Sequence, residues 1–167
     1  DYYGFLAADR VNVAYDMNNH PLPENLEEFN RIESLPAIKR AYEFYKLNMK
    51  YPGRREWHHA LNNMTSYQMQ MAAAVVTQWG WHNRAIFTMG RAKAYDNLEL
   101  RFPILFADLL NKYAKKRNID PSWMYGLVRA ESAFIEDVKS PAGALGLMQV
   151  MPKTGSETAK RIGLKGF

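Results

Sequence analysis

Apolar residues recur at helical spacing along most of this chain, and no stretch alternates as a half-buried strand would. One clear series follows spacings of three and four through Leu35, Ile38, Tyr42, Tyr45 and Met49. Ser34 stands in front of this series and is expected to cap the helix. We therefore predict an all-α fold.

Turn residues divide the chain into short predicted helices. Asn and Pro in residues 18–23 indicate a loop, and Tyr51-Pro52-Gly53 is expected to separate two helices. Short amphipathic helices joined by tight turns favour a helical superhelix, although no clean repeat period is present. We expect helices over residues 2–12, 25–32, 34–49, 54–63, 66–79, 81–96, 104–117 and 152–161.

A domain boundary is predicted near Leu98 to Pro103, where a proline precedes a new helix. Residues 1–97 would form an α-helical superhelical or linker region, and residues 98–167 a second region. The chain begins without a charged and apolar leader, as a mature or trimmed protein also would.

Composition limits the function classes only broadly. The 167 residues carry no cysteine, which excludes disulfides and thiolate zinc sites, and no apolar run reaches the length of a membrane span. The net charge of +5 could attract nucleic acid, anionic membranes or anionic cell-wall polymers, or could simply aid solubility. Part of the surplus lies at Lys112, Lys115, Lys116 and Arg117, where a helix end suits cations.

The helix that starts at Asp120-Pro121 carries the main catalytic candidate. Asp is a good N-cap and Pro is tolerated at the first helical position. A carboxylate on an apolar face should resist ionisation, and a protonated glutamate can act as a general acid. Without further information, a single glutamate on an apolar helix face is more often a core carboxylate satisfied by an arginine or a backbone N–H. One face of this helix is apolar except for Glu131 and comprises Trp123, Leu127, Ala130, Glu131 and Phe134.

The residues after this helix favour a binding site beside Glu131. Ser140-Pro141-Ala142-Gly143 indicates a turn, and Gly143 and Gly146 permit unusual backbone dihedrals. Gln149 offers an amide with donors and an acceptor, between the apolar side chains of Met148 and Met151. A buried acid, a glycine-bearing turn and an amide between methionines would suit a sugar that carries N-acetyl groups.

Other candidates are weaker. His58 and His59 are adjacent on a helix and point about 100° apart, which is unfavourable for a shared metal. Glu136 and Asp137 would lie off the face of Glu131, so neither is expected to be a second catalytic carboxylate. Ser132 has no neighbouring base to activate it, so we interpret it as a structural hydroxyl.

These motifs resemble the lytic transglycosylases, and most closely the soluble lytic murein transglycosylase family. The resemblance rests on Glu131-Ser132, on Ser140-Pro141-x-Gly-Ala and on Gly146-Leu147-Met148-Gln149-x-Met151-Pro152, in that order and spacing. Arg101-Phe102-Pro103 also resembles the family, and residues 2–8 resemble it more weakly. The resemblance implies a lysozyme-like, goose-type-like catalytic domain that continues to a third motif bearing Asn and Tyr. Residues 98–167 would then be its N-terminal part.

The resemblance also implies a reaction. Protonated Glu131 would donate to the glycosidic oxygen between N-acetylmuramic acid and N-acetylglucosamine in peptidoglycan, while the substrate's own N-acetyl carbonyl stabilises the cation. Glu131 would then take the proton of the C6 hydroxyl, whose oxygen attacks C1 and leaves a 1,6-anhydromuramic end. Ser140 and Gln149 would contact the acyl region, and Met148 and Met151 would form an apolar floor.

The expected partners are peptidoglycan glycan strands in the periplasm of a Gram-negative bacterium. Other cell-wall enzymes are candidate partners, whereas nucleic acid, a transmembrane segment, a cofactor and a metal are not expected. Two alternatives stay open: a peptidoglycan hydrolase of the goose-type lysozyme sort, and a non-catalytic helical scaffold that binds the cell wall.

Overall fold

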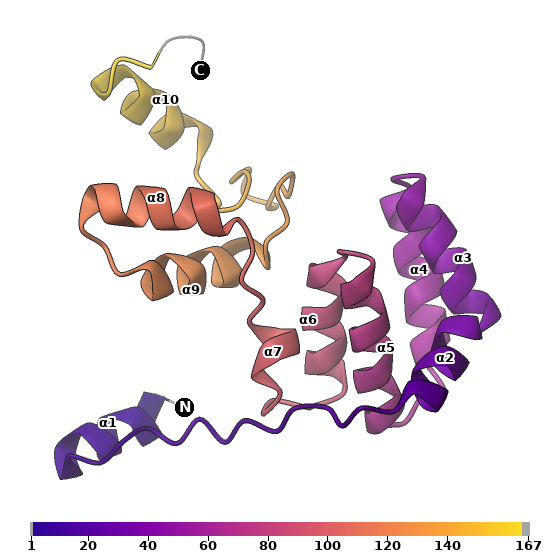
Figure 1. Cartoon of the computed structure of the whole chain (residues 1–167). Helices are drawn as coiled ribbons and strands as arrows, with labels where there is room; N and C mark the ends of the chain where they lie inside the picture. The colour runs from indigo at the N-terminus through magenta and orange to yellow at the C-terminus, as the bar shows by residue number, and fades with distance from the viewer. Residues whose placement is uncertain (1, 165–167) are drawn as a thin grey trace.

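A computed structural model describes residues 2–164, and its regular elements are all helices (Figure 1). Extended pairing in this described range is limited to isolated bridges of Leu145 with Lys139 and Val150. The all-α prediction is therefore confirmed. The helices are α1 (Tyr2–Val11), α2 (Leu26–Ser34), α3 (Pro36–Lys46), α4 (Lys50–Leu61), α5 (Ser66–Gln78), α6 (His82–Arg91), α7 (Leu98–Arg101), α8 (Ala107–Arg117), α9 (Pro121–Ser132) and α10 (Pro152–Arg161).

Helices α2 to α6 stack side by side, mainly as the hairpins α3–α4 and α5–α6 (Figure 1). α8 and α9 form another hairpin, and in Figure 1 α10 lies above this hairpin and α1 below it, both on the side away from α3 and α4. An extended segment from α1 crosses the lower end of the stack. It is held there by hydrogen bonds, since His20 N donates to Asp96 O (2.7 Å) and Leu98 N donates to Asn19 Oδ1 (3.0 Å).

Side-chain caps define several helix starts. Thr65 and Gln68 form a capping box at α5, in which each side chain accepts a hydrogen bond from the other residue's backbone N–H. Asn25 caps α2, and Asp120 caps α9 by accepting from Ser122 N (2.7 Å). The cap at Asp120 was predicted and the cap at Asn25 was not, and both satisfy backbone donors that would otherwise lack partners.

Two predicted boundaries around α3 and α4 are wrong. Ser34 ends α2 instead of capping the next helix, because Leu35 precedes Pro36 and takes an extended conformation with ψ 135°. The stretch predicted as a separator, residues 51–53, lies inside the first turns of α4, where proline is tolerated. Gly53 there is buried, and an added Cβ would meet Phe44 Cβ and Trp81 Cη2, each at 3.3 Å.

The helix expected over residues 81–96 spans only His82–Arg91, and the helix expected from Ile104 starts at Ala107. Both differences have a backbone cause, since Lys93 (φ 56°) and Phe106 (φ 54°) adopt left-handed conformations. A residue in that region ends or delays a right-handed helix.

The larger hydrophobic core lies within α2 to α6 and is centred on Trp57. The indole of Trp57 is fully buried and donates from Nε1 to the Thr88 hydroxyl (2.9 Å), which joins α4 to α6. Burying each such large side chain stabilises the fold by about 1.5–3 kcal/mol. Other fully buried members are Ile32, Ile38, Leu61, Val75, Val76 and Met89.

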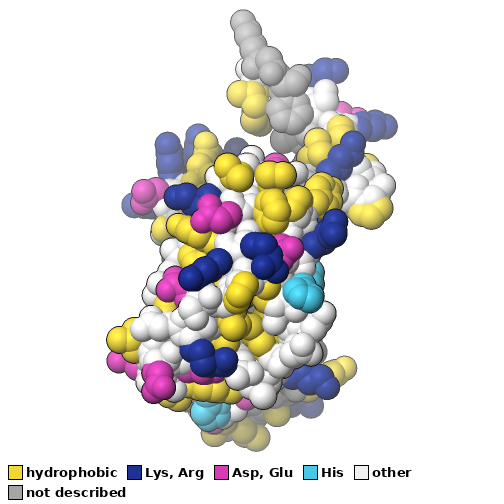
Figure 2. Space-filling view, turned by 90° about the vertical axis from the view of Figure 1, so that its right-hand side faces the viewer, with side chains coloured by type: hydrophobic (Ala, Val, Ile, Leu, Met, Phe, Trp, Pro, Cys, Tyr) yellow, Lys and Arg dark blue, Asp and Glu magenta, His cyan; other side chains and the backbone are white. Residues whose placement is uncertain are grey.

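A second, smaller core joins α8 and α9 to the stack. Ile86 projects from α6 into the cluster formed by Leu110 and Ala114 of α8 with Val128 of α9. The hairpin that carries the catalytic candidate therefore packs against the superhelical part. Figure 2 shows the opposite side of the stack, over α3 and α4, where basic and acidic side chains intermingle on the surface.

Candidate active site

Helix α9, which carries Glu131, is anchored to the segment after α7. Arg129 donates from Nε to the backbone oxygen of Arg101 (2.6 Å), and its guanidinium lies 4.3 Å from the centre of the Phe102 ring. Burial lowers the pKa of Arg129, and the nearby positive charge of Arg101 lowers it further. The flank 101–103 thus positions the last turns of α9.

Glu131 occupies the last turn of α9, and its carboxylate is exposed. Among the described residues it has neither a hydrogen-bond nor an ion-pair partner, so the alternative of a core carboxylate satisfied by arginine does not apply. The predicted buried face is also wrong: Trp123 is 62% exposed, whereas Met124 and Val128 are buried. The described residues therefore leave the Glu131 carboxylate in contact with solvent and do not bury it as predicted.

The buried face differs because α8 packs on the Met124–Val128 side, one residue around the helix from the predicted stripe. Ser132 continues this buried side, and its hydroxyl donates to Val128 O (3.0 Å), as expected for a structural residue. Of the predicted face, Phe134 is buried, but it follows the end of α9.

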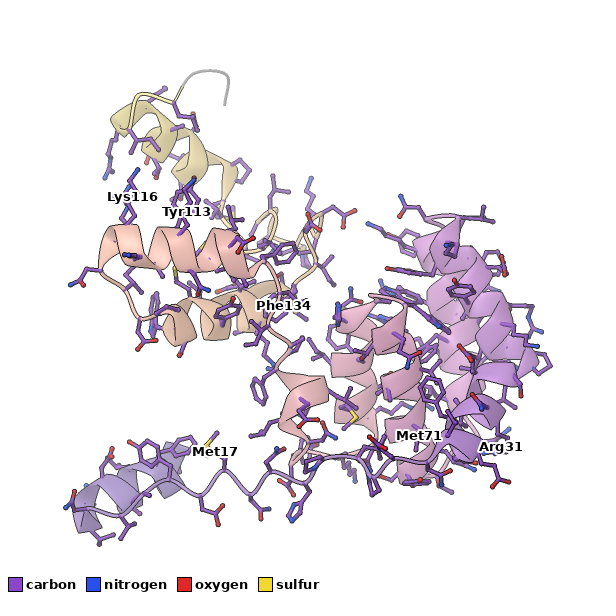
Figure 3. All side chains as sticks on the ribbon, viewed as in Figure 1. Met17, Arg31, Met71, Tyr113, Lys116 and Phe134 are labelled. Carbon is purple, nitrogen blue, oxygen red and sulfur yellow. The ribbon has the colours of Figure 1, made fainter. Side chains whose placement is uncertain are left out.

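The chain leaves α9 through two successive left-handed residues. Ala133 has φ 49° and Phe134 has φ 63°, and both side chains are buried. Such conformations cost non-glycine residues about 1–2 kcal/mol each, so the surrounding packing maintains this bend. Figure 3 shows Phe134 at the end of α9 that faces the helical stack. The bend places the following loop at the Glu131 end of the helix (Figure 1).

Ser140 closes the first turn of this loop. Its hydroxyl accepts a hydrogen bond from Ala144 N (3.0 Å), and its backbone N–H donates to Ala144 O (2.9 Å). The hydroxyl proton has no partner among the described residues and can be donated to a ligand. Gly143 (φ 93°) and Gly146 (φ 72°) adopt the positive φ values that the sequence predicted for this loop.

Gln149 stabilises the second turn from inside. Its Nε2 donates to Gly146 O (2.9 Å) and to Val138 O (3.3 Å), and its backbone has φ 46°. Both amide hydrogens are therefore used within the loop, and Oε1 is the atom left for a ligand. The sequence indicated an amide at this position but not its structural role.

The two methionines provide an apolar surface. Met148 is 40% exposed and Met151 is 43% exposed. Met151 also lines an apolar pocket of about 910 Å³ between the loop and α10, together with Leu145, Val150 and Ile162. Among the described residues that line this pocket, Met151 is the only one of the five predicted site residues.

One functional contact was not predicted. Asp137, which follows the bend after α9, forms an ion pair and hydrogen bond with Lys50 at the start of α4. The hydrogen bond from Lys50 lowers the pKa of Asp137. The two residues are 87 positions apart, so no local pattern could have indicated this link between the loop and the helical stack.

No group of three acidic, His or Cys side chains suited to a metal is found among residues 2–164. None of the described helices has both the length and the apolar character that a membrane crossing requires.

Two family models match separate parts of the chain. Residues 31–98 match the soluble lytic murein transglycosylase L domain, and residues 108–166 match the transglycosylase SLT domain. The chain therefore belongs to the lytic transglycosylase family.

Particular soluble lytic murein transglycosylases are similar along nearly the whole chain. The Salmonella typhimurium protein is 31% identical over 99% of this chain, and the Escherichia coli K12 protein is 29% identical over 99%. The chain spans about a quarter of the length of these relatives.

Solved structures agree in fold. The lytic transglycosylase Slt of Pseudomonas aeruginosa, an inactive Glu→Gln mutant, superposes with a TM-score of 0.91 at 36% identity. It covers 98% of this chain, which corresponds to 26% of that protein. The 70-kDa soluble lytic transglycosylase of E. coli gives a TM-score of 0.87 at 29% identity, over 99% of this chain and 26% of that protein. The all-α fold of the described residues is thus shared with these lytic transglycosylases.

Proposed function

We propose that the protein cleaves the β-1,4 bond between N-acetylmuramic acid and N-acetylglucosamine in peptidoglycan, with Glu131 as acid and then base. The observation that carries this proposal is the unpaired Glu131 carboxylate at the end of α9, beside a loop preformed by Ser140 and Gln149. The inactive Glu→Gln mutant of the P. aeruginosa relative supports a glutamate as the essential group.

In this mechanism Glu131 performs both proton transfers. Donation to the glycosidic oxygen breaks the bond to C1, and removal of the C6 hydroxyl proton lets that oxygen close the 1,6-anhydro ring. The product gains no water, and the carboxyl group returns to its protonated state. The Ser140 hydroxyl and Gln149 Oε1 would hold the acyl region of the sugar, and Met148 and Met151 would contact its apolar side.

The domain division proposed with this function is a superhelical or linker region over residues 1–97 and the N-terminal part of the catalytic domain over residues 98–167. We place the protein in the periplasm of a Gram-negative bacterium, where its peptidoglycan substrate lies. The exposure of Trp123 and Glu131 fits a catalytic domain whose further segments cover this face of α9.

The test uses purified sacculi and the full-length protein. We expect mass spectrometry to find 1,6-anhydromuropeptides with the wild type and at least about 100-fold fewer with Glu131→Gln, since general acid–base catalysis contributes about that much or more. Glu157→Gln, an exposed carboxylate on α10 that lies outside the lining of both pockets, is the matched control and should keep full activity. Full activity in Glu131→Gln would remove Glu131 from its role, and reducing muramic ends would make the enzyme a hydrolase.

A further inference from the structure

A second pocket, of about 650 Å³, lies between the helical stack and the bend after α9. Three segments that are distant in the sequence meet there: the turn into α4, the turn into α6 and residues 134–137. Its polar lining is predominantly basic and includes Lys50, Arg54, His82, Asn83 and Arg84. Glu131 and the predicted substrate-binding residues lie outside this lining.

Two helices begin at this pocket without a side-chain cap. Met49 precedes α4 and Trp81 precedes α6, and neither side chain accepts a hydrogen bond from the first turn. The first N–H groups of a helix carry partial positive charge and favour an anion. These starts reinforce the positive character that the basic side chains give to the pocket.

Arg84 is the most unusual member of the lining. It is 4% exposed, and its guanidinium lies 4.7 Å from the centre of the Phe87 ring and 5.8 Å from that of Trp81. Its Nε donates to Asn83 Oδ1 (3.0 Å), but no carboxylate of the described residues pairs with it. A buried charge is costly unless a partner compensates for it.

The electrostatics of the pocket favour an anion. Burial, and then the positive charge of Arg54, lower the pKa of Arg84 to about 10. Arg54 likewise has no ion-pair partner in the described part of the chain. Burial lowers the pKa of His82, and its buried Nδ1 has no hydrogen-bond partner among the described residues.

The charge balance of the lining favours a singly charged ligand. Lys50 is neutralised by its ion pair with Asp137. Arg54 and Arg84 then face one further carboxylate, that of Glu136, which leaves a single positive charge in excess. A planar guanidinium matches a carboxylate in a bidentate arrangement, and one carboxylate balances the single excess positive charge, whereas a doubly charged phosphate would leave a negative charge in excess.

We propose that this pocket is a carboxylate-binding site in which Arg54 and Arg84 hold the anion near the start of α6. The carboxylate could belong to a free small acid or to a peptide stem attached to the glycan of peptidoglycan; the second source rests on the proposed function. Binding there would tie the loop that follows α9 to the helical stack.

The test records NMR amide shifts of His82, Asn83 and Arg84 in the 167-residue chain during titration with sodium acetate. Sodium chloride at equal ionic strength is the reference salt. We expect saturable shifts with acetate and a dissociation constant about ten-fold higher in Arg54→Gln, because a charge-assisted hydrogen bond is lost. Arg55→Gln is the matched control, since Arg55 is exposed and turned about 100° away on α4.

A purified disaccharide-peptide from peptidoglycan and the same disaccharide without its peptide, with its lactyl carboxyl group converted to an amide, separate the two sources. Shifts with the peptide-bearing form but not with the bare sugar assign the peptide stem, and shifts with acetate alone assign a free acid. Equal affinities in Arg54→Gln and Arg55→Gln, identical shifts with chloride, or no shifts with any carboxylate would overturn the proposal. The assay involves no turnover, so its failure is distinguishable from an inactive Glu131.

Discussion

Replacing Gln149 by glutamate should loosen the loop beside Glu131 while leaving the helices intact. The wild-type amide donates to Gly146 O and Val138 O, and a carboxylate of the same shape can donate to neither. Each hydrogen bond contributes about 0.5–1.5 kcal/mol, so the loss of both should cost about 2 kcal/mol. Repulsion between the new charge and the two carbonyl oxygens adds to this cost.

Hydrogen exchange measures this effect locally. The amides of Leu145, Gly146 and Val150 are bonded within the loop, to Val150 O, Val138 O and Leu145 O respectively. A loss of about 2 kcal/mol in local stability corresponds to about 30-fold faster exchange at these amides, relative to their intrinsic rates. Gln78→Glu makes the same charge change on an exposed site of α5 and should leave the loop amides unchanged.

The pH dependence provides an independent check on the mechanism. The introduced carboxyl group can donate one hydrogen bond when protonated, so its pKa in the folded loop should lie above the ordinary value of about 4.3. The destabilisation should be complete above that folded pKa and should decrease as the pH falls toward the ordinary value. Unchanged exchange at all three amides would refute a structural role for Gln149 and leave it as a ligand contact only.

Three further predictions concern the scaffold. Gly53→Ala should lower the free energy of unfolding by about 1–2 kcal/mol, because the added methyl group overpacks against Phe44 and Trp81. Gly126→Ala in α9 meets nothing within 4 Å and should raise the free energy of unfolding by about 0.5–1 kcal/mol. Urea unfolding measures both changes, and equal effects would contradict the packing argument. Thr65→Ala should cost about 1 kcal/mol in the same assay by removing the capping box of α5, whereas Thr65→Ser keeps the capping hydroxyl and should show no such loss. Because Lys50 lowers the pKa of Asp137, this ion pair stabilises the fold above the ordinary aspartate pKa and stops doing so as the pH falls through the folded value. The difference in unfolding free energy between wild type and Asp137→Asn should therefore vanish in acid and shrink in high salt, and a difference that persisted in acid would refute the linkage.

The helical class, the cap at Asp120 and the glycine turns at Gly143 and Gly146 could be predicted from the sequence alone. Each of these features depends on interactions between residues that lie within a few positions of one another in the sequence. The same holds for the motif that indicated Glu131, because it lies within one helix and the loop that follows. The break at Leu35 was not predicted from the apolar spacing; it arises because Pro36 restricts the residue before it to an extended conformation.

Only the tertiary structure decided which face of α9 is buried, because that face depends on where α8 packs rather than on the apolar residues of α9 itself. It also brought Lys50 to Asp137, and Arg54 and Arg84 to one pocket, across separations that no local periodicity records. These long-range contacts form a pocket with a buried arginine that pairs with no carboxylate of the described residues. The physical reason is that long-range packing sets burial, and burial determines what an ionisable group costs and what it can bind.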